Sequence, residues 1–171
     1  LADYRTCHQM GHEESHPQPT PAGRRIGRHH PLHGISTEFI RGNHIEDLYE
    51  RILDASMKIM RSEFASIQMF YPERGSSGEL RLLGYGGFNK ESANFWEWVG
   101  TDSDSSCGAA FRRGQRIVVT DVKECDFMKD TKDQAVYLQT GIHAVQTTPL
   151  ISRNGTFVGA ISTHWRYPHQ P

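Results

Sequence analysis

The part of the sequence with the clearest chemical potential is the run from Thr101 to Thr120, which contains Cys107. Asp104 is a suitable N-cap for a short helix over 105–113, and the glycine that follows can end that helix. Cys107 would then lie in the first helical turn, where free backbone N–H groups and the helix dipole favour an anion, a carbonyl or a thiolate. Small residues follow it, however, so a closely packed core cysteine is the alternative interpretation.

Composition excludes several classes of function. The 171 residues are 36% hydrophobic with a formal net charge of −1, which fits one modest core and provides no broad electrostatic field for nucleic acid. The sequence has neither an apolar run of membrane-spanning length nor a signal pattern. Cys7, Cys107 and Cys125 form no CxxC spacing, which suits a reducing compartment. We expect a cytoplasmic segment of a longer protein, without a nucleic-acid or membrane partner.

The chain divides into an arm and a domain. Residues 1–38 are rich in His, Pro, Gly and Arg and predict an arm or linker, whereas residues 39–171 predict one domain. Three histidines in the arm have a four-residue spacing that suits zinc or nickel on one helix face: His8, His12 and His16. Gly11 weakens such a helix and Pro17 ends it, so we predict no metal site.

An amphipathic helix is predicted over 45–60, with Asn43 as its N-cap. Its apolar residues fall on one stripe, which is expected to pack on a sheet: Ile45, Leu48, Ile52, Ala55, Ile59 and Met60.

The remaining elements follow from alternating and helical patterns. They are a hairpin over 64–71 and 79–85, an aromatic helix over about 90–99, a strand over 116–120, a loop over 121–130, a helix over 131–140, and a hairpin over 142–152 and 156–166. The Asn154-Gly155 pair predicts a type I′ turn in the last hairpin. Four polar residues would share one face of that hairpin: Gln146, Thr148, Ser162 and His164. The order of elements indicates an α+β fold with an antiparallel sheet.

Four phrases in this order resemble the GAF domain family, over about residues 44–168. They are Cys107-Gly108-Ala109-Ala110, GQRIVVTD over 114–121, AVQTTPL over 144–150 and GAISTHW over 159–165. The resemblance implies an antiparallel sheet with helices on both faces, and the family's C-terminal helix is missing here. It also implies a sensory or relay role in a bacterial signalling protein, and a sensor histidine kinase is the expected parent.

The family's known ligands are cyclic nucleotides, tetrapyrroles, haem and small metabolites, and some members bind none, so the cofactor stays unknown. The resemblance implies a pocket between the sheet and the connections over 89–111. Its candidate ligand-binding residues are Trp96, Cys107, Phe111, Asp121, Tyr137 and Gln146. A covalent bilin is disfavoured because Cys125 is not followed by a histidine. Haem would need an axial ligand such as His143 or His164 and is also disfavoured.

Two alternatives remain open beside a non-catalytic, ligand-sensing domain. Because the family's last helix normally lies beside the first, the Ile45–Met60 helix is expected to form a homodimer, and the domain could be a ligand-free interaction module. The free methionine sulfoxide reductases share the fold and carry a Cys-Gly phrase that Cys107 resembles. Those enzymes need further cysteines, which the strand over 117–121 lacks, and Cys125 is out of place for that role.

Overall fold

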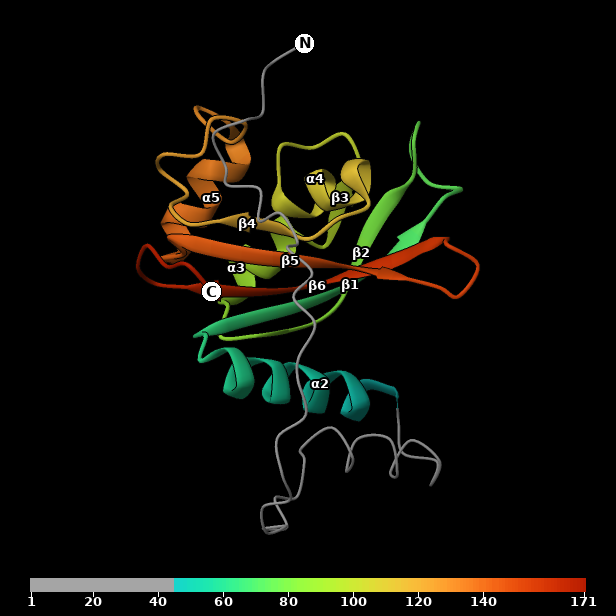
Figure 1. Ribbon diagram of the computed structural model, residues 1–171, viewed down its shortest axis with the longest axis horizontal. Helices are drawn as coiled ribbons and strands as arrows, with labels where there is room; N and C mark the ends of the chain where they lie inside the picture. Colours follow the sequence, from blue (N-terminus) through green and yellow to red (C-terminus); the bar gives the residue numbers. More distant parts are fainter. Residues whose placement is uncertain (1–44) are drawn as a thin grey trace, which may run out of the picture.

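The computed structural model describes residues 45–171, which form a six-stranded antiparallel sheet with helices on both faces (Figure 1). The sequence predictions for the arm, for its three histidines and for Asn43 lie outside the described residues. The strands are β1 (Phe64–Tyr71), β2 (Glu79–Gly86), β3 (Trp98–Gly100), β4 (Ile117–Val119), β5 (Ala144–Ile151) and β6 (Phe157–Trp165). Their order across the sheet is β3-β2-β1-β6-β5-β4. The α+β prediction is therefore confirmed.

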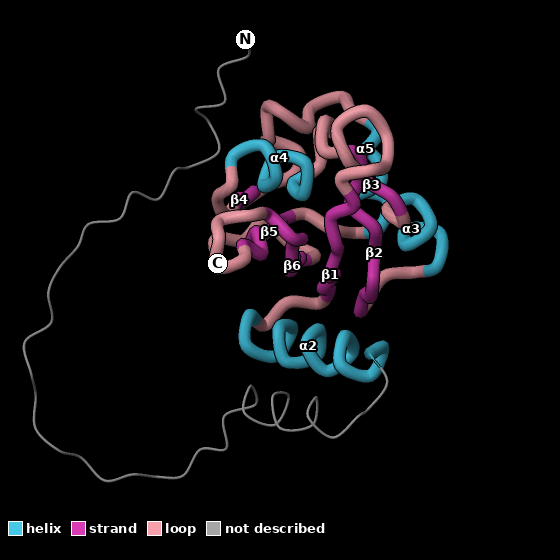
Figure 2. Tube along the Cα trace, turned by 90° about the vertical axis from the view of Figure 1, so that its right-hand side faces the viewer, coloured by secondary structure: helices cyan, strands magenta, loops and turns pink. Residues whose placement is uncertain are grey.

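Helix α2 (Ile45–Met60) covers one face of the sheet, over β1 and β2, and Figure 2 shows it as a separate layer. The side chains that it packs on the sheet are spaced four residues apart: Tyr49, Leu53 and Met57. Two glycines of β2 give them room, because a Cβ at Gly84 would lie 3.1 Å from Leu53 and one at Gly86 would lie 2.7 Å from Met57.

The apolar stripe predicted for α2 is not the face that packs on the sheet. Ile45 is 44% exposed and Ile59 is 51% exposed, whereas Leu48 and Ile52 are half-buried and only Ala55 is buried. The helix has two apolar faces. The face with Tyr49, Leu53 and Met57 packs on the sheet because its side chains fit over the β2 glycines. The predicted stripe is thus left on the flank of the helix.

Three residues, 61–63, connect α2 to β1. Arg61 ends the helix in the left-handed region, with φ of 51°. The backbone N–H of Ser62 donates to the Met57 carbonyl at 3.0 Å, and that of Glu63 donates to the His164 carbonyl of β6 at 3.2 Å. The end of α2 is therefore fixed directly to two central strands.

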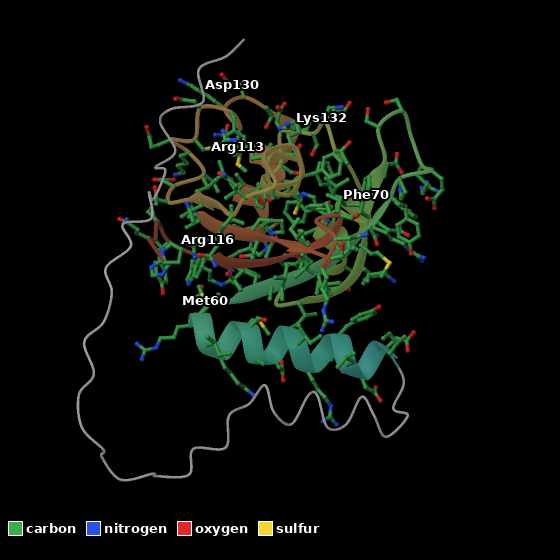
Figure 3. The ribbon with its side chains drawn as sticks, turned by 45° about the vertical axis from the view of Figure 1, so that its right-hand side comes forward. Met60, Phe70, Arg113, Arg116, Asp130 and Lys132 are labelled. Carbon is green, nitrogen blue, oxygen red and sulfur yellow. The ribbon has the colours of Figure 1, made fainter. Side chains whose placement is uncertain are left out.

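The opposite face of the sheet carries the main core, beneath α3 (Lys90–Phe95), α4 (Ser106–Arg113) and α5 (Lys132–Thr140). The loop over 121–130 also contributes to it, since Val122, Cys125 and Met128 are fully buried. Figure 3 shows this division: Met60 lies on α2, whereas Asp130 and Lys132 lie on the other side of the sheet.

The helix predicted over 90–99 is shorter than expected. Asn89 caps it, as predicted, by accepting the Ser92 N–H at 2.8 Å, but the helix ends at Phe95 and β3 follows. The Leu82 N–H donates to the Glu97 carbonyl at 2.9 Å, which begins the pairing of this segment with β2. Pairing with a distant strand therefore overrides the local helical pattern.

The last hairpin differs from its prediction in turn type. A type I′ turn needs two left-handed residues, but only Gly155 has a positive φ, of 84°. The Gly155 N–H instead donates to the Ser152 carbonyl at 2.9 Å, which closes a turn just before the left-handed glycine.

The expected polar face of that hairpin is also wrong. Thr147 pairs with Ser162, and Gln146 pairs with Thr163. Successive residues of a strand point to opposite faces, so Ser162 and His164 face the main core, whereas Gln146 faces away from it.

Helix α4 begins one residue later than predicted, because Ser105 rather than Asp104 caps it. The Ser105 hydroxyl accepts the Gly108 N–H at 3.1 Å, and Gly114 ends the helix with φ of 60°, as predicted. Arg112 ties the preceding loop to the helix, since its Nη1 donates to the carbonyls of Thr101 at 2.7 Å and Ser103 at 2.8 Å. This loop passes so close to the helix that a Cβ at Gly108 would lie 2.6 Å from the Ser103 carbonyl oxygen.

We expect Gly108→Ala to destabilise the domain by about 1–3 kcal/mol, although alanine is the better helix former, because the new methyl group meets backbone. The matched control is Gly100→Ala, whose Cβ would meet only the end of the Asp102 side chain, which can move. Urea denaturation of both variants measures the difference, and equal losses of stability would contradict the role given to Gly108.

Candidate functional site

A cavity lies between the main-core face of the sheet and the helices above it. It is lined by Ser66, Gln68, Leu82, Phe88, Trp96, Val99, Ser105, Cys107, Tyr137 and His164. The space between these side chains amounts to about 300 Å³ when its open mouth is counted. The cavity itself has a volume of about 10 Å³, which is room for about one water molecule.

A chain of buried hydroxyl groups runs beside the cavity under the start of α4. The Thr147 hydroxyl donates to Ser106 at 2.8 Å, and it lies 2.8 Å from Ser162. Because a hydroxyl has a single proton, Ser162 must be the donor to Thr147. The chain continues to Tyr137, whose hydroxyl is 3.0 Å from that of Ser106, and to Cys107, whose sulfur is 3.7 Å from Ser162. The chain thus joins α4 and α5 to β5 and β6.

Cys107 lies in the first turn of α4, but its environment disfavours the thiolate that this position was expected to favour. Burial raises the pKa of the Cys107 thiol to about 11, and the hydroxyl of Ser162 opposes this shift only in part. Desolvation therefore outweighs the helix dipole here. Cys107 is a neutral thiol that lines the cavity.

The other ionisable cavity residues are also held in their neutral forms. Burial raises the pKa of Tyr137 well above its ordinary value and lowers the pKa of His164 to about 3. The charge of Asp133, one turn before Tyr137 on α5, also raises the pKa values of Cys107 and Tyr137, and burial raises the pKa of the Asp133 carboxyl itself. No formal charge therefore lines the cavity at neutral pH.

Three cavity residues carry buried polar atoms that have no hydrogen-bond partner. They are Oε1 of Gln68, Nε1 of Trp96 and both ring nitrogens of His164. The Trp96 indole N–H lies close enough to the Asp133 carboxyl to lower the pKa of that carboxyl. The two groups do not, however, form a hydrogen bond of standard geometry. Unpaired buried groups cost about 1–3 kcal/mol each, so their concentration around one cavity is unusual for plain core.

The structure brings together three of the six residues predicted for a ligand site, since Trp96, Cys107 and Tyr137 line the cavity. The other three lie elsewhere. Phe111 packs against the rings of Phe70 and Phe157, with its ring centroid 4.8 and 5.0 Å from theirs. Asp121 accepts the Lys123 N–H at 2.9 Å, and Gln146 faces away from the main core.

Sequence reasoning did not select Gln68 and Ser66, which line the cavity from β1. The available signal was their position, because the predicted alternation put both on the strand face that also carries Phe70. Polar residues on the buried side of a central strand indicate a cavity or a hydrogen-bond network. His164 was considered as a haem ligand and as one of the polar hairpin residues, but it was not among the six predicted ligand-binding residues.

The described residues limit which groups the site can hold. Within residues 45–171, no group of three or more His, Cys, Asp or Glu side chains is placed to bind a metal ion. A tetrapyrrole does not fit a cavity with room for about one water molecule, in which the His164 ring lies 5.3 Å from Phe88 and 6.0 Å from Tyr137. In the same part of the chain, helices are too short or too polar to cross a membrane.

Similar solved structures share this fold. A domain assigned to a two-component sensor histidine kinase protein from Sinorhizobium meliloti superposes with a TM-score of 0.59 and 22% identity, over 76% of this chain and 78% of that chain. The free methionine-R-sulfoxide reductase from Neisseria meningitidis, solved with its substrate, superposes with a TM-score of 0.59 and 15% identity. The match covers 82% of this chain and 74% of that chain. The NreA protein from Staphylococcus aureus, mutated in its nitrate-binding site, superposes with a TM-score of 0.55 and 18% identity. The match covers 70% of this chain and 88% of that chain.

At these identities the likeness shows the fold alone, and a search of curated proteins found no match. The GAF domain family model, in contrast, matches residues 42–170, which is most of the chain. The matched range contains every described strand and helix, together with all the residues that line the cavity. The chain therefore belongs to the GAF domain family.

Proposed function

We propose that this domain is a non-catalytic sensor that binds a small molecule in the cavity between the sheet and α3, α4 and α5. The observation that carries this proposal is the set of unpartnered polar atoms on Gln68, Trp96 and His164 around one cavity. A bound molecule could pair with them, which would offset the cost of burying them. Among the similar structures, NreA is described with a nitrate-binding site and the sulfoxide reductase with its substrate, so the fold accommodates small ligands.

Ligand binding could be converted into a signal because the cavity walls come from different layers. Gln68 and His164 belong to the sheet, whereas Trp96 and Tyr137 belong to the helical layer above it. A molecule that contacts both layers would favour one packing of the helices on the sheet over another. Such a shift between packings is the physical basis of a sensor domain.

The absence of catalysis in this segment is proposed from the protonation states of the cavity. A general acid or base works best when its pKa lies near the working pH. Burial instead moves the pKa values of Cys107 and Tyr137 upward and that of His164 downward, away from neutrality. The same burial weakens the thiol-redox alternative, because the nucleophile in that chemistry is the thiolate.

The cellular context is part of the proposal. The likeness to a domain from a sensor histidine kinase protein supports a bacterial two-component kinase as the parent, with this domain in the cytoplasm. Any kinase activity would then belong to another part of that protein.

A second candidate function, as a dimerisation module, is favoured by the flank of α2. Ile45, Leu48, Ile52 and Ile59 are spaced three, four and seven residues apart, and those at the helix ends are about half exposed. Such a spacing is typical of the seam between two packed helices. A homodimer through this stripe is compatible with ligand sensing, because α2 contacts the same sheet that lines the cavity.

Cavity filling tests the ligand-binding proposal. We expect the native mass of the purified domain to exceed its denatured mass by one non-covalent increment, and we expect Ser66→Leu to abolish that increment by occupying the cavity. Ser56→Leu is the matched control, because Ser56 lies on α2, away from the cavity, and should leave the increment unchanged. A wild-type domain that is empty in every preparation would contradict ligand sensing.

Acid sensitivity tests the neutral state of His164. The pKa of His164 is about 3 in the folded protein and 6.5 in the unfolded chain, so between these pH values only the unfolded state binds the proton. The free energy of unfolding should then fall between pH 6.5 and pH 3, by up to about 1.4 kcal/mol per pH unit.

The comparison is between wild type, His164→Phe and the half-buried control His143→Gln, each measured by urea denaturation across that range. His164→Phe should lose most of the slope and the control should retain it. The raised pKa of Asp133 changes the free energy of unfolding in the opposite direction as the pH falls. Because all three proteins contain Asp133, its contribution cancels in the comparison. An unchanged slope in His164→Phe would refute the assignment.

The dimer is tested by the molar mass in solution. We expect wild type to form a dimer at micromolar concentration and Ile59→Glu to shift it toward monomer, because the charge would be buried in the seam. Glu50→Lys, at an exposed position on the side of the helix opposite Ile59, is the control and should remain dimeric. A wild-type domain that is monomeric at all concentrations would contradict this candidate.

A further inference from the structure

The identity of the unpartnered atoms specifies what a ligand must offer. The Gln68 Oε1 atom is an acceptor and needs a donor, whereas the Trp96 Nε1–H is a donor and needs an acceptor. Neutral His164 adds one donor and one acceptor on the same ring. These three side chains are at most 5% exposed, so bulk water does not satisfy them. A ligand that pairs with these atoms should therefore carry both a donor and an acceptor.

The charges around the cavity specify the charge of the ligand. The polar groups that line it are an amide, hydroxyls, a thiol, an indole and an imidazole, and none is charged at neutral pH. An ion would lose its hydration without meeting a counter-charge in the lining. Anions are opposed further by Asp133 and Asp104, whose mutual repulsion contributes to the raised pKa of Asp133. A cation would meet the Trp96 N–H, which is a donor.

The rings around the cavity specify the shape of the ligand. The Trp96 ring lies 4.8 Å from Tyr137 and 5.6 Å from Phe88, and the His164 ring lies within 6.0 Å of both Tyr137 and Phe88. The room between these rings is narrow, and planar groups pack well against aromatic faces. Because the cavity has room for only about one water molecule, any organic ligand must displace these side chains, and a flat, compact molecule needs the smallest displacement.

We propose that the cavity is selective for a small, uncharged, planar molecule that bears a carboxamide-like group. Its carbonyl oxygen accepts from the Trp96 indole, and its N–H donates to the Gln68 side-chain oxygen. His164 completes the pairing from β6. This inference rests on the proposed ligand-binding function and assigns the chemical class of the ligand.

Three probes of nearly equal shape test the assignment: benzamide, the benzoate anion and the benzamidinium cation. Binding is followed in the full chain by the ¹H–¹⁵N resonance of the Trp96 indole, with Trp98 and Trp165 as internal references. We expect benzamide to shift the Trp96 resonance and to bind at least about tenfold more tightly than either ion.

Two variants connect the selectivity to Gln68. Gln68→Met retains the volume of the side chain but removes its amide, and it should weaken benzamide binding by about tenfold. Gln146→Met is the same substitution on the opposite face of the sheet and should change binding less than about twofold. Equal effects of the two substitutions would refute the role of Gln68.

The remaining outcomes separate this inference from the proposed function. If benzoate or benzamidinium binds at Trp96 as tightly as benzamide, the uncharged class is wrong and small-molecule binding stands. If none of the three binds while the native mass shows a bound molecule, the carboxamide assignment is wrong and the sensor function stands. If none binds and the native mass shows an empty domain, both proposals fail.

Discussion

The buried hydroxyl chain under α4 is the interaction on which the arrangement of this domain depends. Thr147 and Ser162 come from neighbouring strands, Ser106 comes from α4 and Tyr137 comes from α5. Apolar packing is not directional, so it would tolerate small rotations of these helices on the sheet. Hydrogen bonds are directional, and an unpaired buried hydroxyl costs about 1–3 kcal/mol. The hydroxyl chain therefore fixes one relative position of α4, α5, β5 and β6. The cavity lies beside this hydroxyl chain, and it is lined by residues whose polar atoms have no partner: Gln68, Trp96 and His164.

The two faces of the sheet therefore differ in chemistry. The α2 face is held by a small apolar cluster over the β2 glycines. The other face combines an extensive aromatic and aliphatic core with the hydroxyl chain and the cavity. Burial is what makes the cavity electrically neutral, because it moves each ionisable group in it toward its uncharged form. One physical cause thus underlies both the proposed absence of catalysis and the proposed preference for an uncharged ligand.

Local signals predicted much of the fold from the sequence. Strand β1 has the predicted bounds, 64–71, and α5 has its predicted cap, since Thr131 accepts the Gln134 N–H at 3.2 Å and Gly141 is left-handed. Predictions failed where distant segments decide the outcome. The residues after Phe95 pair with β2 instead of extending α3, and a register shift between Leu150 and Ile151 pairs Gln146 with Thr163 and so places it on the opposite face.

The candidate site shows the same division. The position of Cys107 in the first turn of a capped helix could be predicted from its neighbours, and the cap itself was displaced by only one residue. The protonation state of Cys107 could not be predicted from the sequence, because the desolvation that raises its pKa depends on the strands and helices that enclose the thiol. Gln68 and His164 were likewise not selected, since a polar residue on a strand becomes significant only when its burial and its unpaired atoms are known.

The three-residue turn after α2 has a mechanical consequence. Gln68 lies roughly 17 Å along β1 from Glu63, at about 3.3 Å per residue, and that strand is hydrogen-bonded on both sides. The Glu63 N–H donates to the backbone carbonyl of His164, so both strands that carry polar cavity residues are joined to the end of the helix. This connection is stiff, because the turn is too short to absorb a displacement. A movement of β1 would therefore reach the last turn of α2 as a rigid shift instead of being dissipated in a flexible loop.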